Sequence, residues 1–142
     1  MPVNLIDNPG FENGLVGYDN WGNAVAINTD SHSGSGALQV GNGAGGVGQN
    51  LDGKLTVGQT YRLGVYAKIG NANEWSAVTI QVRDSAQVQI LAKDLVINSN
   101  GYQLYTVDFV MPTGGVAVYL SIWKNAGSSN LIVDDLSLVS IP

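Results

Sequence analysis

Short runs in which apolar and polar residues alternate recur along the sequence, and this period of two limits the fold more than any other feature. Successive side chains of a β-strand point to opposite faces, so alternation indicates strands with one face in a core. The period of an amphipathic helix is hard to find, and clusters of Gly, Asn, Asp and Ser separate the alternating runs. The sequence therefore predicts an all-β fold.

The number and spacing of the alternating runs favour a jelly-roll β-sandwich of two antiparallel sheets. A chain of 142 residues is long enough for one domain with a core, so residues 1–142 are predicted to form a single module. The Gly-rich segment 41–49 is expected to be a flexible turn, because it lacks the helix that a phosphate loop requires. The predicted strands are 24–29, 36–41, 46–51, 60–69, 76–83, 87–92, 103–111, 116–123 and 131–139.

The stretch "AVTIQVRDSAQVQILAKD", residues 77–94, is predicted to be a hairpin with uncharged amides on its outer face. With a turn centred on Ser85, Gln81 and Gln89 are directly opposed, and a small shift of the turn makes them diagonal neighbours. Gln87 shares their side. A solvated strand face normally carries Thr, Lys or Glu, so these amides indicate a surface that contacts a ligand. The apolar residues of both arms are predicted to point inward: Val78, Ile80, Val82, Val88 and Ile90.

The three tryptophans lie at loops and strand ends. Trp21 lies in the polar loop "YDNWGNA", and Trp123 ends the strand "VAVYLSIW" on the outward side that also carries Tyr119. An indole face can cover the flat C–H patch of a pyranose ring while amides exchange hydrogen bonds with its hydroxyls. Trp21 and Trp123 fit this role, although both also fit packing at the edge of the core. For Trp75, at a strand entrance, structural packing is favoured.

Composition excludes several classes of partner. The net charge is −5, and the six Lys and Arg residues are scattered, whereas nucleic-acid binding needs clustered cations. No apolar run is long enough to cross a bilayer, and the start "MPVNLIDNPG" lacks a secretory signal, so any export signal was removed or lies elsewhere in a larger protein. Cysteine is absent, which rules out disulfides and thiolate chemistry. A neutral ligand is expected, with no nucleic-acid or membrane partner.

Acidic residues near the two chain ends are predicted to lie together, because the first and last strands of a sandwich are commonly neighbours. Glu12 belongs to "NPGFE", and Asp134, in "LIVDDLSL", shares the inward side with Leu136 and Leu138. A buried carboxylate needs a partner, and no Lys or Arg is close in the sequence. Two interpretations are open: a calcium ion with about six to eight oxygen ligands, or backbone amides that donate to Asp134 while Asp135 stays in solvent.

Catalysis receives little support from the sequence. The only histidine, His32, lies in the turn-like "TDSHSGSG" and is expected to be solvated, and no GxSxG nucleophile motif occurs. Glycoside hydrolysis needs a pair of carboxylates, and only Asp19 and Asp108 are candidates for the aromatic face. A binding protein is therefore favoured over an enzyme, and a protein-contact or adhesion domain that uses the same face is an alternative.

Four segments resemble, in order and spacing, the β-sandwich carbohydrate-binding modules of the family 4, 9, 16 and 22 group: "NLIDNPGFENG", "TDSHSGSGALQV", "GQTYRLGVYAK" and "LIVDDLSL". The resemblance runs over nearly the whole chain and is closest to family 16, whose members hold β-1,4-linked glucose or mannose chains between two tryptophans and two glutamines. It implies that Trp21, Trp123 and Gln81 contact the ligand. The second glutamine is then Gln89, with Gln87 as its rival.

The resemblance also implies a structural calcium ion that ties the chain ends to an early loop, away from the ligand. The implied ligands are Gly10, Glu12, Ser33, Gly36 and Asp134. Tyr18 and the outward-facing Tyr66 are predicted to extend the ligand surface.

The expected function is that of a non-catalytic, monomeric module that binds cello- and manno-oligosaccharides and glucomannan. The resemblance implies that it is tethered to an extracellular bacterial glycoside hydrolase and directs that enzyme to plant cell-wall polysaccharide. Xylan and β-1,3-glucan are the alternative ligands.

Overall fold

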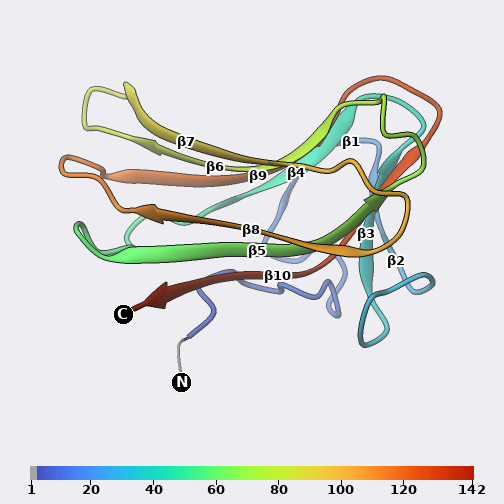
Figure 1. Cartoon of the computed structure of the whole chain (residues 1–142), viewed down its shortest axis with the longest axis horizontal. Helices are drawn as coiled ribbons and strands as arrows, with labels where there is room; N and C mark the ends of the chain where they lie inside the picture. The colour runs from blue at the N-terminus through green and yellow to red at the C-terminus, as the bar shows by residue number, and fades with distance from the viewer. Residues whose placement is uncertain (1–2) are drawn as a thin grey trace.

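Ten strands form two five-stranded antiparallel sheets that pack face to face in the computed structural model, which describes residues 3–142 (Figure 1). Sheet A has the order β1-β4-β9-β6-β7, and sheet B has the order β2-β3-β10-β5-β8. The predicted all-β sandwich is confirmed. The strands are β1 (Asp19–Gly22), β2 (Ala24–Ile27), β3 (Ala37–Gly41), β4 (Gly45–Asn50), β5 (Thr60–Ile69), β6 (Ser76–Arg83), β7 (Gln89–Val96), β8 (Gln103–Val110), β9 (Ala117–Lys124) and β10 (Asn130–Ile141).

Most strand bounds agree with the alternation in the sequence, and the differences have local causes. β5 and β6 match the predicted ranges, whereas β7 begins and ends later than predicted. β1 was not predicted because its four residues are all exposed and show no alternation. The expectation of a flexible turn over 41–49 holds only for residues 42–44. From Gly45 onward the chain forms β4, which agrees with the predicted strand 46–51 and pairs with both β1 and β9.

The β6–β7 hairpin contains a β-bulge that changes the predicted side-chain directions. Val82 pairs with Leu91 and Arg83 pairs with Gln89, so Ile90 has no partner. A bulge inserts one residue and reverses the alternation beyond it. Ile90 and Val88 were predicted to point inward and are instead 37% and 56% exposed.

The same bulge sets the relation between the two hairpin glutamines. Gln81 pairs with Ala92, whereas Gln89 pairs with Arg83, two residues further along β6. The predicted direct opposition of Gln81 and Gln89 is therefore wrong, and the diagonal arrangement is the one observed. Gln87 lies in the turn with φ of 66°, before β7 begins.

The core lies between the two sheets and is built from the inward-facing apolar residues of both. Burying one such side chain stabilises the fold by about 1.5–3 kcal/mol. Because the apolar residues point inward, the outer face of sheet A carries small, polar and aromatic residues. Fully buried members of the core include Leu63, Val65, Ile80, Leu120 and Leu138.

The N-terminal segment from Asn4 to Pro9 runs beside β10, on the sheet B side of the sandwich (Figure 1). The Leu5 N–H donates to the Leu138 carbonyl at 2.9 Å, and the Leu136 N–H donates to the Pro9 carbonyl at 3.0 Å. This pairing brings Glu12 to the middle of β10. Within residues 3–142 no helix has the length and apolar character needed to cross a membrane.

Candidate functional site

An aromatic cluster of Trp21, Tyr119 and Trp123 lies on the outer face of sheet A. Alternation in β9 turns Tyr119 and Trp123 away from the core, and Trp21 reaches them from β1. The Trp21 ring lies 5.9 Å from the Tyr119 ring at 21°, and 5.9 Å from the Trp123 ring at 51°. Trp21 is 43% exposed, and the other two are half-buried. The cluster therefore offers aromatic surface to a ligand from solvent.

Two glycines in β4 allow a close approach to β9, and one of them makes room for the Tyr119 ring. Gly48 pairs with Ser121, and a Cβ at position 48 would collide with the Tyr119 ring. Gly46 pairs with Trp123, and a Cβ there would collide with neighbouring backbone. Glycine in a strand interior often marks such a close approach. The Gly-rich sequence that looked like a flexible turn is therefore the floor of the aromatic cluster.

Amide side chains adjoin the aromatic cluster on its polar side. Gln81 pairs with Tyr119 across β6 and β9, and Asn50 pairs with Tyr119 from β4. Gln81, Gln87 and Arg83 line one hollow of ≈ 310 Å³ together with Tyr119. Gln89, on the edge strand, does not line it. The geometry therefore places Gln87, rather than Gln89, in the hollow with Gln81.

Hydrogen bonds fix the orientation of two rings of the cluster. The Tyr119 hydroxyl donates to Asp19 at 2.9 Å, and the Trp123 Nε1–H donates to the Asn125 side-chain oxygen at 3.2 Å. Burial, together with Asp19, raises the pKa of Tyr119 to about 12, so the hydroxyl keeps its proton at neutral pH. The rings are thus held in place before a ligand arrives.

Two tyrosines that were predicted to extend the ligand surface lie elsewhere. Tyr18 packs on Phe11, with ring centroids 5.0 Å apart, and its hydroxyl donates to the Asn8 carbonyl at 3.1 Å. Burial raises the pKa of Tyr18 well above its ordinary value. Tyr66 lies on β5 of sheet B, the opposite side of the molecule from the aromatic cluster. Tyr119 was missed as a ligand candidate, although it shares the outward side of β9 with Trp123.

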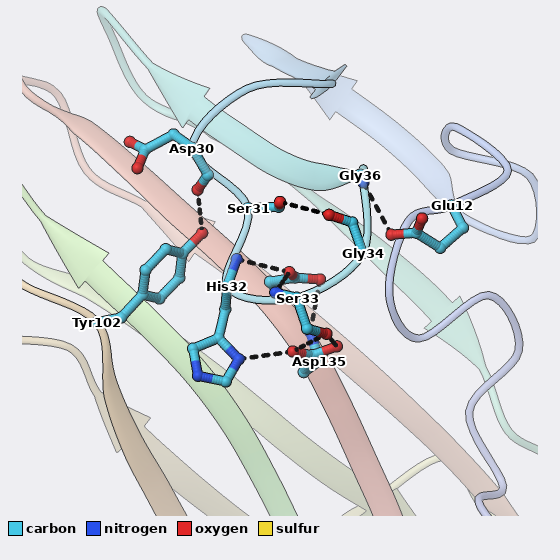
Figure 2. Close-up of polar contacts among 10 residues, drawn as sticks. Glu12, Asp30, Ser31, His32, Ser33, Gly34, Gly36, Tyr102 and Asp135 are labelled. Atoms are coloured by element: carbon cyan, nitrogen blue, oxygen red, sulfur yellow. Dashed lines mark hydrogen bonds and ion pairs between the residues drawn. The ribbon is translucent and has the colours of Figure 1, made fainter.

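The carboxylates of Glu12 and Asp134 both accept hydrogen bonds from the turn at residues 31–36, and Figure 2 shows Glu12 beside Gly36 at one end of that turn. Glu12 accepts hydrogen bonds from the backbone of Ser35 and Gly36, at 2.9 and 2.8 Å. These hydrogen bonds lower the pKa of Glu12, and the bond from the Ser35 backbone has the largest effect.

Asp134 accepts from the backbone N–H groups of His32 and Ser33, at 2.9 and 3.0 Å. It is fully buried, and desolvation raises its pKa.

Asp134 does not point into the core as predicted. It pairs with Tyr66, an outward residue of sheet B, and a bulge between Asp134 and Ser137 separates it from the inward Leu138. The bulge residue Asp135 has φ of 50°. Asp134 is buried because the 31–36 turn covers it on the outer side of the sheet.

His32 and Asp135 were expected in solvent, and both are engaged. The His32 ring stacks on Tyr66 with centroids 3.7 Å apart, and its Nδ1 lies 2.7 Å from the Asp135 carboxylate (Figure 2). The Ser33 hydroxyl also donates to Asp135 at 2.7 Å. The interpretation in which backbone amides donate to Asp134 therefore describes the hydrogen bonds of Asp134. The same interpretation placed Asp135 in solvent, and this part is wrong.

The residues around this turn also fit a calcium ion by their chemistry. A Cβ placed on Gly10 would lie 3.7–3.8 Å from side-chain atoms of Glu12, Asp134 and Asp135, so these three acidic residues surround one small region. No Lys or Arg in residues 3–142 forms an ion pair with any of them. Across that same part of the chain, no three His, Asp or Glu side chains converge as a metal site, so carbonyl oxygens would have to complete the coordination.

A buried ion pair, which the sequence did not reveal, lies next to Trp123. Lys124 is fully buried, and its Nζ lies 2.7 Å from Glu74 and donates to the Asn125 carbonyl at 2.9 Å. The Ser129 hydroxyl donates to the same carboxylate at 2.8 Å. The hydrogen bonds from Lys124, then Ser129, lower the pKa of Glu74 to about 2. The pair joins the end of β9 to the loop before β6.

We expect Glu74→Gln to reduce the loss of stability in acid. The folded-state pKa of Glu74 is depressed, so its contribution is complete above the ordinary value of 4.5 and is lost as the pH falls through about 2. The variant should unfold at a lower temperature than the wild type near pH 7, and the difference should shrink by about pH 2. Thermal unfolding followed by circular dichroism measures both midpoints. Equal differences at the two pH values would contradict this prediction. Asp108→Asn removes a carboxylate from an exposed pair with Arg62 and is the comparison, because an exposed pair should contribute much less near pH 7 than the buried one.

The family follows from the sequence. Residues 3–129 match the family model described as "Carbohydrate binding domain", which covers module families 4 and 9. The chain therefore belongs to this family of carbohydrate-binding domains. The predicted resemblance and the carbohydrate-binding class are confirmed. No curated protein sequence matches the chain.

Several solved carbohydrate-binding modules have the same fold as this chain. "Family 16 Carbohydrate Binding Module-2" superposes with a TM-score of 0.83 at 25% identity, over 96% of this chain and 99% of that one. The family 22 xylan-binding domain of Paenibacillus barcinonensis Xyn10C has a TM-score of 0.75 at 14% identity, over 99% and 96%. A family 61 module in complex with β-1,4-galactotriose has a TM-score of 0.67 at 17% identity, over 98% and 99%. At these identities the last two show the fold alone.

Proposed function

We propose that this carbohydrate-binding module is non-catalytic and holds β-1,4-linked glucan or mannan chains against the outer face of sheet A. The observation that carries the proposal is the aromatic cluster of Trp21, Tyr119 and Trp123, directly beside the amides of Gln81 and Gln87. Indole faces suit the apolar faces of pyranose rings, and amides, which both donate and accept, suit the hydroxyls at the ring edges.

The expected affinity is modest. Each partly covered indole contributes roughly 1–2 kcal/mol by area, and each amide hydrogen bond contributes about 1 kcal/mol net. Several kcal/mol of lost freedom oppose these gains. The resulting dissociation constant lies between about micromolar and millimolar, or roughly −8 to −4 kcal/mol.

The biological role that we propose is proximity. A module tethered to an extracellular bacterial glycoside hydrolase raises the effective concentration of that enzyme at plant cell-wall polysaccharide, even when its own affinity is modest. The module is expected to act as a monomer, because one face suffices for a single glycan chain.

We also propose a structural calcium ion at the 31–36 turn. Glu12 and Asp134 would supply carboxylate oxygens, and Gly10, Ser33 and Gly36 would supply carbonyls. A bound calcium ion offsets negative charge and links oxygen ligands from distant parts of the chain. This chain's own residues already connect the N-terminal segment, the turn and β10 through backbone hydrogen bonds to the same carboxylates.

Isothermal titration against cello-, manno- and xylo-oligosaccharides tests the proposed ligand. We expect heat of binding with the first two and weaker binding with the third. Stronger binding of the xylo-oligosaccharides would show that xylan, rather than glucan or mannan, is the ligand. The absence of binding to all three and to a glycan array would favour a protein-contact domain, and release of reducing sugar from glucomannan would favour an enzyme.

A further inference from the structure

Trp75 lies on the same outer face as the aromatic cluster, one strand away from Trp123. The Asn125 N–H donates to the Trp75 carbonyl at 2.9 Å, which extends the β6–β9 ladder by one step beyond the Ser76–Lys124 pair. Ala77 pairs with Trp123 within that ladder. Alternation therefore turns Trp75 to the outward side with Ala77, and makes it a diagonal neighbour of Trp123. Such neighbours lie about 7–8 Å apart, within reach of aromatic side chains.

The exposure of Trp75 does not fit a packing role. It is 42% exposed, close to the 43% of Trp21, although structural packing was favoured from the sequence. Its indole Nε1 makes no hydrogen bond to any residue in the described range 3–142, and its ring stacks on no other ring there. Ala77, small and nearly fully buried, puts no long side chain between Trp75 and Trp123.

The backbone around Trp75 is held firmly. Glu74 precedes it and pairs with the buried Lys124, which follows Trp123, at 2.7 Å. One ion pair therefore joins the strand ends that carry Trp75 and Trp123. A side chain whose backbone is already ordered loses less freedom on binding than one on a mobile loop.

We propose that Trp75 is a third ligand-contacting tryptophan, which adds a subsite beyond Trp123 and makes affinity depend on the length of the glycan chain. The proposal rests on the proposed function, because it needs a glycan on the outer face of sheet A. The chain would run from the amides beside Tyr119, past Trp21 and Trp123, to Trp75. Long oligosaccharides would cover the Trp75 ring and short ones would not.

Titration with cellohexaose and cellotriose tests the subsite. Trp75→Ala should weaken hexaose binding about tenfold and triose binding less than about twofold. Trp75→Phe, which keeps an aromatic face, should fall between the wild type and the alanine variant for hexaose. Leu104→Ala is the matched control, because Leu104 is 50% exposed on sheet B, away from the proposed glycan path. It should change neither affinity.

The outcomes separate this inference from the proposed function. If the wild type binds hexaose and the Trp75→Ala variant binds it with unchanged affinity, the subsite is refuted and the proposed function is kept. An equal loss for both lengths also overturns it, because Trp75 would then act on the site as a whole. A wild type that binds neither sugar, nor their manno-counterparts, overturns the proposed function and the subsite with it.

Discussion

Trp21→Ala and Trp123→Ala should each remove measurable binding of cellohexaose and mannohexaose while the thermal unfolding midpoint stays nearly unchanged. Each change deletes a ring of the aromatic cluster, and the remaining contacts of a micromolar to millimolar site are too few to offset the freedom lost on binding. Neither ring lies in the core between the sheets, so little buried apolar surface is lost. Isothermal titration and circular dichroism provide the two readouts.

The comparison with other aromatic residues makes this experiment specific. Tyr66→Ala removes a ring from the outer face of sheet B and should leave binding unchanged, because the ring stacks on His32 on the far side of the molecule. If both tryptophan variants still bind the sugars, the proposed glycan site on sheet A is refuted. Binding lost in Tyr66→Ala but kept in Trp21→Ala would move the site to the other sheet.

Calcium should raise the thermal stability of the protein more than it raises glycan affinity. A ligand present at about 100 times its dissociation constant stabilises the folded state by about 2.7 kcal/mol. The proposed calcium ligands join the N-terminal segment, the 31–36 turn and β10 on sheet B, whereas the proposed glycan site lies on sheet A. Unfolding curves with calcium chloride and with EDTA measure the shift, and titration in the same two buffers measures the affinity.

Two carboxylate variants show whether the shift comes from this region. Glu12→Gln should reduce the calcium-dependent part of the midpoint, because an amide oxygen binds calcium less well than a carboxylate. Asp108→Asn, on β8 and away from the turn, should keep the full shift. A midpoint that does not respond to EDTA in the wild type would refute the calcium site.

Alternation along the sequence predicted the sandwich well, and its failures occur where an extra residue enters a strand. The bulge in the β6–β7 hairpin exposes Val88 and Ile90, and the bulge at Asp135 turns Asp134 to the outer side of sheet B. A period-two pattern cannot show such an insertion, because the register depends on the partner strand.

Residues of the candidate site differed in how well the sequence revealed them. Trp123 and Gln81 lie inside long strands, so alternation alone gave their directions. Trp21 belongs to β1, a short strand without alternation, so its place in a polar loop and the resemblance pointed to it, but no pattern gave its direction. Tyr66 was correctly placed outward, but a sequence does not show on which of two sheets an outward residue lies. That choice depends on the strand order.

The buried Lys124 marks a different limit. Lysine is almost never fully buried unless it is paired, and its partner Glu74 is 50 residues away in the sequence. No local pattern connects two such residues. The two residues meet because β6 and β9 lie side by side in sheet A.

All three tryptophans lie on one face of sheet A, and the core between the sheets contains none. The tryptophan fluorescence of the protein therefore originates at the proposed glycan surface. A bound sugar should shift the emission by removing water from the indoles, so a simple fluorimeter can follow a titration. Because these rings already contact solvent in the folded state, denaturation changes their surroundings only moderately. Unfolding is therefore better followed by circular dichroism of the backbone.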